Sequence, residues 1–359
     1  RFDPSRYGKL AMPHPRGGPA CETANFNRWS QPTTPDVETG LAWDIISQVG
    51  ALLKSSTPRN PLSRPAERLY LTGQSQTAGY ARTYASAFAR FVLGRDGRPL
   101  YDAFLYSGSP PWQVPLHQCA PDLAADDPRL TTPPAGVPVM EIFAEGDIGT
   151  NIVTRRADSD TAPDLFRRYE VAGAPHGDLW QQRSYPNAAD QHRATTPAEA
   201  ATPACLPANA KPSDFPVRYV LNSAWRNLEA WVRDGVAPPR GVPLQRADRA
   251  QTLFDPATAF ATDEHGNARG GIRSPAVEVP VARWIGAMTG AFNCMFRGYK
   301  YPLDRAELRR LYPTHASYVA RVRESAAALR SQRWLTEADA AEIIAAAEAA
   351  DIDSASPSG

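Results

Sequence analysis

Helical and strand-like hydrophobic patterns alternate along the first half of the chain. One helix is predicted at 37–56, with four apolar residues at helical spacing on one face: Leu41, Ile45, Val49 and Leu52. A second helix is predicted at 76–94, where Gly94 would end it. Four short apolar runs are typical of buried strands: 68–73, 101–109, 137–147 and 165–178. Apolar strands that alternate with helices predict an α/β fold, with a mostly parallel sheet covered by helices on both faces.

The second half of the chain contains two long segments with little periodicity. Residues 179–215 are polar and proline-bearing, which predicts a long loop over the surface. Residues 240–300 are predicted to form a second long loop with a few short strands, and either loop is a candidate lid. An amphipathic helix between them, at 219–235, is predicted to bury three residues: Trp225, Leu228 and Trp231.

Two helices are predicted at 303–350, because two residue pairs have the three-residue separation of a capping box: Asp304 with Glu307, and Thr336 with Asp339. Residues 1–36 are rich in Pro, Gly and polar residues and are predicted to be irregular. The chain is therefore expected to form one α/β domain at 37–359 behind an irregular N-terminal segment.

Composition excludes several classes of function. The 359 residues include 39 basic and 38 acidic side chains, so the chain has no general attraction to nucleic acid or to an anionic membrane. No apolar run approaches the roughly 20 residues that span a bilayer. No CxxC or Cys/His cluster has the spacing of a metal site.

The chain has four widely separated cysteines: Cys21, Cys119, Cys205 and Cys294. An even number in loop-like surroundings, together with 35 prolines, favours two disulfide bonds in an exported protein. Four cysteines allow three pairings, and buried thiols are the alternative.

The sequence Gly73-Gln74-Ser75-Gln76-Thr77 stands between a predicted strand and a predicted helix. Such a corner is typical of a nucleophile elbow, in which the serine has a strained backbone and the residue two before it is small. The residue two after the serine is usually glycine, but here it is Thr77. The alternative interpretation is that Ser75 only caps the helix.

Two further residue types follow in the order of a hydrolytic triad. Asp147 stands at the end of one predicted strand, and His176 follows another by a short turn. A serine hydroxyl becomes an effective nucleophile when an imidazole accepts its proton and a carboxylate orients that imidazole. Ser75, Asp147 and His176 are the predicted catalytic residues, with Glu145 as the alternative acid.

Five segments of the chain resemble a poorly characterised family of bacterial and fungal α/β-hydrolase-domain proteins: "RFDPSRYGKL", "GQSQTAGYARTYASAF", "YDAFLYSGS", "GGIRSPAVEVPVA" and "LYPTHASYVARV". The resemblance implies an α/β-hydrolase fold, a serine nucleophile and, often, export from the cytoplasm. Only 74 residues precede Ser75, so the early strands of that fold are expected in a segment upstream of residue 1.

These features predict a serine hydrolase, most simply one that cleaves carboxylic esters of small molecules. The N–H of Gln76 is expected to donate to the oxyanion, and Trp180 and Tyr185 are expected to line the substrate pocket. No cofactor or metal ion is required. A lactonase, acyltransferase or peptidase would use the same triad, and a non-catalytic binding module is the alternative from another class. The expected location is secreted or periplasmic.

Overall fold

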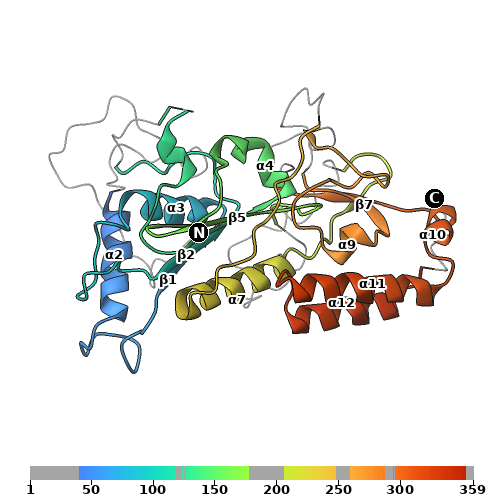
Figure 1. The fold of residues 1–359 in the computed structure, drawn as a ribbon. Coiled ribbons are helices and arrows are strands. Elements are labelled where there is room, and N and C mark those ends of the chain that lie inside the picture. The colour runs from blue at the N-terminus through green and yellow to red at the C-terminus, as the bar shows by residue number, and fades with distance from the viewer. Residues whose placement is uncertain are drawn as a thin grey trace, which may run out of the picture. The chain divides into compact units, whose positions relative to one another are not determined.

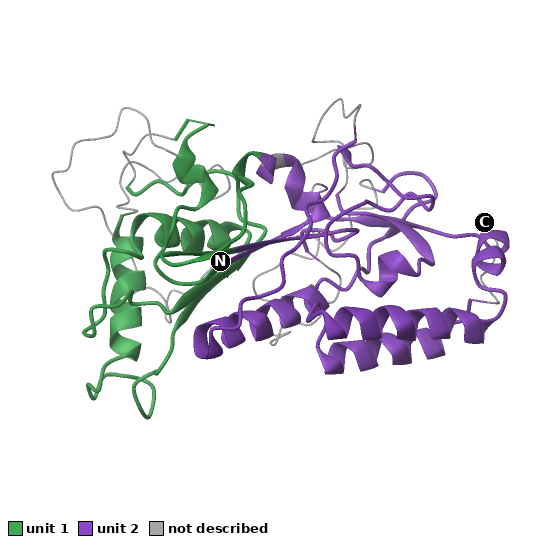
Figure 2. Ribbon diagram, in the orientation of Figure 1, with its two compact units in different colours: residues 1–139, 153–166, 189–196 green, residues 140–152, 167–188, 197–359 purple. Residues whose placement is uncertain are grey.

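The computed structural model describes residues 40–117, 123–124, 126–177, 206–247, 259–287, 294 and 296–352. The chain forms two compact units, which are coloured separately in Figure 2. Unit 1 comprises residues 1–139, 153–166 and 189–196, and unit 2 comprises residues 140–152, 167–188 and 197–359.

The main sheet has five strands in the order β1-β2-β3-β5-β4. Their bounds are Tyr70–Gln74 for β1, Ala103–Ser107 for β2, Val139–Ala144 for β3, Ser159–Thr161 for β4 and Asp164–Val171 for β5. The sheet is mixed but mostly parallel: β1 and β2 pair in parallel, whereas β4 and β5 are antiparallel. Helices flank it, so the predicted α/β class is confirmed.

Unit 1 contains β1, β2 and two helices, α2 (Leu41–Leu53) and α3 (Gln76–Ala87), labelled in Figure 1. Aromatic side chains dominate its core. Trp43 of α2 stacks on Phe88 with ring centroids 5.3 Å apart, and Tyr84 of α3 meets Tyr101 edge-on at 5.5 Å. This packing attaches both helices to the sheet, because Tyr84 also contacts Phe104 of β2.

Two expectations for these helices are wrong. The buried residues of α2 are Trp43 and Gly50, whereas Leu41, Ile45 and Val49 are exposed. The large indole of Trp43 decides which side of the helix faces the core. Helix α3 ends at Ala87 rather than Gly94, and Gly94 instead belongs to a turn in which its N–H donates to the Arg98 carbonyl at 2.7 Å.

Unit 2 contains α7 (Arg218–Asp234), α11 (His315–Ser331) and α12 (Glu337–Ala349). Helix α7 follows the predicted pattern, with Leu228 and Trp231 buried, Trp225 half-buried and Gly235 ending the helix at φ 68°. Tyr219 of α7 packs in one cluster with Ala326 of α11 and Ala340 of α12. Figure 1 shows α11 and α12 side by side.

Three helices, not two, occupy 303–350. Asp304 caps the first, α10 (Arg305–Leu311), and forms the predicted capping box with Glu307. Pro313 follows this helix, and Thr314 then caps α11 by accepting from the Ser317 N–H. The hydrophobic pattern did not show this boundary. Pro313 sets it, because proline removes a backbone donor and clashes with a continuing helix. Thr336 caps α12 as predicted.

A small second sheet has the strand order β6-β8-β7: Lys211–Pro212, Tyr299–Pro302 and Ala282–Ile285. The segment 240–300, predicted to hold a few short strands, contains helix α9 (Pro275–Glu278) as well as the strands β7 and β8. Residues 1–36 and most of 179–215 lie outside the described residues. Among the helices that the structure describes, none has the length and apolar character needed to cross a membrane.

Candidate active site

Ser75 occupies the corner between β1 and α3 in a backbone conformation that is rare for a residue with a side chain. Its φ is 57° and its ψ is −122°, and its side chain makes no capping hydrogen bond to the helix. The Ser75 N–H donates to the Ser107 carbonyl at 2.9 Å, which continues the pairing of β1 with β2 into the corner. A serine that only capped α3 would bond a backbone N–H of the helix and would not need a positive φ. The capping interpretation is therefore wrong.

Gly73 makes this tight corner possible. A Cβ at this position would lie 2.3 Å from the Thr77 carbonyl oxygen and 2.6 Å from the Ala78 nitrogen. These are backbone atoms of the first turn of α3, so they cannot move aside as a flexible side chain would. The predicted need for a small residue two before the serine is confirmed.

Thr77 replaces the usual glycine with a side chain that closes the corner. Its hydroxyl accepts from the Gln74 N–H at 2.9 Å and donates to the Gln74 carbonyl at 2.8 Å. The residues before and after Ser75 are therefore linked directly. The exposed position of Thr77 leaves room for the side chain, so the departure from glycine is compatible with the elbow.

The N–H of Gln76 remains available at the start of α3. It is the first residue of the helix, where backbone donors have no intrahelical acceptor. No residue in the described ranges accepts a hydrogen bond from it. Its position next to the serine matches that of an oxyanion donor.

Asp147 and His176 lie together in unit 2. Asp147 is on α4 (Glu145–Asn151), directly after β3, and His176 is on the turn that follows β5. The His176 Nδ1 is 2.6 Å from the Asp147 Oδ1, while the Asp147 Oδ2 accepts from the Ala144 N–H at 2.9 Å. The Phe296 ring lies 4.9 Å from the imidazole, between centroids. The carboxylate thus holds one imidazole nitrogen in a shielded setting.

The pKa of His176 is raised above its ordinary value. Burial lowers it, since a low-dielectric setting disfavours the imidazolium, but the charge and hydrogen bond of Asp147 outweigh that effect. The same carboxylate that orients the ring therefore makes its other nitrogen more basic.

Glu145 has a different set of partners. Its Oε2 accepts from the Gly173 N–H at 2.7 Å and its Oε1 from the Gly286 N–H at 3.0 Å. Burial raises the pKa of Glu145 to about 7, against the lowering effects of these hydrogen bonds and of two arginine side chains. The Glu145 carboxylate therefore joins its own segment to the segments of Gly173 and Gly286.

The predicted residues thus occur in two groups. Ser75 and Gln76 lie in unit 1, and Asp147 and His176 lie in unit 2. Trp180 and Tyr185 lie outside the described residues. Sequence reasoning missed Phe296, because a lone aromatic residue 120 positions from the histidine has no pattern around it.

The serine corner and the Asp–His pair are the features of the described residues that bear on the class of protein. The chain belongs to this family: the family described as "Alpha/beta hydrolase domain" matches residues 1–345. Family membership supports a hydrolase in general. No curated protein and no solved structure matches the chain.

Proposed function

We propose that the protein is a serine hydrolase that cleaves carboxylic esters through Ser75, His176 and Asp147. The observation that carries the proposal is the backbone of Ser75, which has a positive φ although its hydroxyl makes no cap. A strained residue at a strand–helix corner persists only where the surrounding structure holds it, and such strain clusters at catalytic sites. The Asp147–His176 pair supplies the base that such a serine needs.

The reaction would proceed through an acyl-enzyme. The Nδ1–H of His176 donates to Asp147, so Nε2 is the nitrogen that accepts the proton of the Ser75 hydroxyl. The Ser75 oxygen attacks the ester carbonyl carbon, and the Gln76 N–H stabilises the negative charge that develops on the carbonyl oxygen. His176 then returns the proton to the departing alcohol. Water attacks the acyl-enzyme by the same route and releases the acid.

The leaving alcohol and the acyl chain need walls that exclude water. We propose that Trp180 and Tyr185 line this pocket, since both follow His176 within ten positions. Aromatic side chains of this kind line most small-molecule pockets. The mechanism uses no cofactor or metal ion.

Labelling with a fluorophosphonate tests the proposal, because the reagent reacts covalently with an activated serine. We expect one label on the protein, located at Ser75 by peptide mapping, and loss of labelling in Ser75→Ala and His176→Ala. Ser55→Ala serves as the control, since the Ser55 hydroxyl bonds a carbonyl at the end of α2. A folded but unlabelled protein would instead indicate a non-catalytic binding module.

The type of substrate requires a separate comparison. p-Nitrophenyl esters of graded acyl length should be hydrolysed at rates that depend on chain length and on Ser75. A preference for lactones, peptides or acyl transfer to an alcohol over hydrolysis would replace the ester assignment while keeping the triad.

We also propose that the protein is exported, to the periplasm or outside the cell, and contains two disulfide bonds. Cys294 is buried in a cluster with Ile285 and Tyr299, and Leu206 packs against this cluster. Four cysteines allow three pairings, and Cys21, Cys119 and Cys205 lie outside the described residues. Peptide mapping without reductant should recover two disulfide-linked peptide pairs, whereas free thiols would contradict the proposal.

A further inference from the structure

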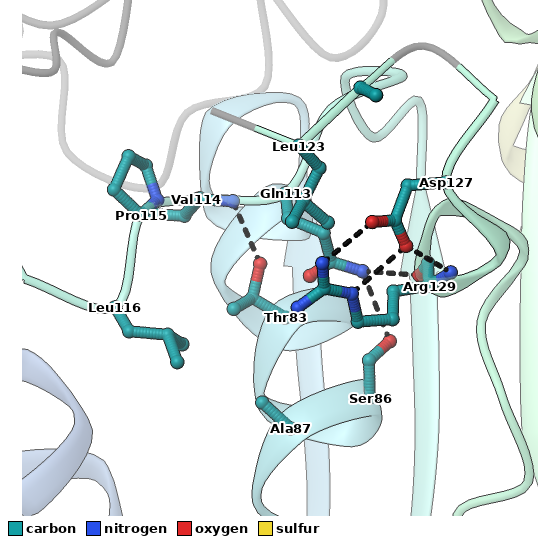
Figure 3. Close-up of a pocket in the computed structure, with 11 residues that line it drawn as sticks. Thr83, Ser86, Ala87, Gln113, Val114, Pro115, Leu116, Leu123, Asp127 and Arg129 are labelled. Carbon is teal, nitrogen blue, oxygen red and sulfur yellow. Dashed lines mark hydrogen bonds and ion pairs between the residues drawn. The ribbon is translucent and has the colours of Figure 1, made fainter. Parts of the chain in front are cut away.

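Unit 1 has a cavity of about 350 Å³ against the second half of α3, shown in Figure 3. Its wall combines the helix with the loop after β2 and with the segment leading into the short helix η2 (Pro128–Thr131). The volume lies at the lower end of the range for small-molecule sites. Ser75 does not line it: Thr83, the nearest lining residue on α3, is eight positions further along, about 12 Å of helix.

The loop that forms one wall has a fixed backbone. The Val114 N–H donates to the Thr83 hydroxyl at 2.9 Å, and the Trp43 indole N–H donates to the Leu116 carbonyl at 2.8 Å. The side chains between these anchors are apolar, and that of Leu116 is exposed although its backbone is held. The cavity is therefore largely formed before any ligand arrives, with an apolar body.

Polar side chains lie at one side of the cavity, as Figure 3 shows for Gln113, Asp127 and Arg129. The Gln113 Nε2 donates to the Ser86 hydroxyl at 3.2 Å and to the Arg129 carbonyl at 2.9 Å. Because the Ser86 hydroxyl itself donates to the Arg82 carbonyl, it must accept from Gln113, which fixes the orientation of the amide. The Gln113 amide oxygen is left as an acceptor that no donor in the described ranges reaches.

The charged residues at this side neutralise each other. Arg129 donates through Nε at 2.9 Å and through Nη2 at 2.6 Å to the two carboxylate oxygens of Asp127. The two Nη1 N–H groups and the second Nη2 N–H of Arg129 have no acceptor among the described residues. An anionic ligand would face the Asp127 carboxylate and the Gln113 oxygen, and a cation would face Arg129, so a neutral polar group fits best.

We propose that this cavity is a ligand site, separate from the catalytic serine, for a small neutral alcohol with an apolar body. The hydroxyl donates to the Gln113 oxygen and accepts from the Arg129 Nη1–H, while the body packs on Val114, Pro115 and Leu116. The site is independent of the proposed hydrolysis.

The binding of 2-naphthol, followed by its fluorescence, tests the site on the intact protein. We expect saturable binding to one site and two- to tenfold weaker binding of 2-methoxynaphthalene, which lacks the donor, as for loss of one neutral hydrogen bond. Gln113→Met should remove this preference while keeping the affinity for 2-methoxynaphthalene. The comparison of the two ligands on the unchanged protein does not depend on how any variant folds.

A second test of the site fills the cavity with a larger side chain. Ala87→Phe places a ring in the cavity and should weaken 2-naphthol binding at least tenfold, whereas Ala51→Phe, on an exposed position of α2, should not. Ser75→Ala should bind 2-naphthol normally even though it loses fluorophosphonate labelling. Equal affinity for the two ligands, equal binding by the two phenylalanine variants, or loss of binding in Ser75→Ala would each overturn the proposal.

Discussion

The corner at Ser75 depends on two neighbours with opposite requirements for side-chain volume. Gly73 must lack a Cβ, because backbone atoms of α3 occupy that space. Thr77 must have a side chain, because its hydroxyl bonds both backbone polar groups of Gln74. The strain at Ser75 is thus supported on both sides by short-range contacts that the sequence of five residues encodes.

Gly73→Ala should lower the free energy of unfolding by about 1–3 kcal/mol, the usual cost of forcing an extra methyl group into a packed site. Gly94→Ala is the matched control, since its Cβ would meet the exposed Asp96 side chain at 3.0 Å and the Arg98 carbonyl oxygen at an ordinary contact distance of 3.7 Å. Urea denaturation measures both. Equal effects of the two variants would show that the strand–helix corner is looser than these distances indicate.

Substitutions of the two neighbouring acids should have different effects, one on activity and the other on stability. Asp147→Asn should lower kcat on the order of 10⁴-fold with little change in stability near pH 8, where His176 is neutral in both states, because the amide cannot hold the imidazole in the productive tautomer. Glu145→Gln should have the opposite profile, losing about 1–3 kcal/mol of stability because an amide NH₂ faces one of two buried N–H donors. Ester turnover and urea denaturation of both variants test this. An inactive Glu145→Gln with full stability would reverse the assignment.

The raised pKa of His176 sets the acid limit of the proposed activity. The imidazole must be neutral to accept the Ser75 proton, so kcat/KM should fall as pH drops through its folded-state pKa. The midpoint should lie above about 6.5, the ordinary value for histidine. A pH–rate profile with p-nitrophenyl esters measures it, and a midpoint below that value would contradict the role of Asp147.

At the scale of elements, the hydrophobic pattern predicted four strands and the long helices, and it placed His176 after a strand. It also placed Asp147 at the end of a strand, which is wrong: β3 ends at Ala144, and Asp147 lies in the first turn of α4. It failed where a single residue overrode the pattern. In α2 the indole of Trp43 faces the core, and the predicted apolar stripe of Leu41, Ile45 and Val49 is exposed. Pro313 divides one predicted helix into α10 and α11. For the acid the sequence predicts Asp147 and leaves Glu145 as the alternative, because a pattern does not show in which direction two acids two positions apart on a helix point.

The exposed stripe on α2 gives a test at this scale. Ile45→Gln and Val49→Gln should each change the free energy of unfolding by no more than about 0.5 kcal/mol, as for ordinary surface positions. Trp43→Ala should cost about 3–5 kcal/mol, because it empties a buried aromatic site. Urea denaturation again applies, and large losses from the glutamine variants would mean that this face of α2 is covered in solution.

At the scale of the whole molecule, the two strongly buried groups of the candidate site impose the same pH trend on stability. The folded-state pKa of His176 is raised, so its contribution is complete below the unfolded value and is lost as pH rises through the folded value. The pKa of Glu145 is raised to about 7 from 4.5, so the unfolded chain loses this proton first and stability falls across that interval. Groups with lowered pKa values, such as Asp263, titrate below this window.

We therefore expect the protein to be more stable near pH 5 than near pH 8. Urea denaturation at intervals between these values measures the trend, and the slope reports how many more protons the folded chain binds. Glu145→Gln should remove the fall in the free energy of unfolding between about pH 4.5 and 7, because the amide does not titrate. Asp147→Asn should reduce the pH dependence of stability that His176 causes, because the charge that raises the histidine pKa is gone. A stability that rises from pH 5 to pH 8 would mean that neither group keeps in solution the buried partners described for it.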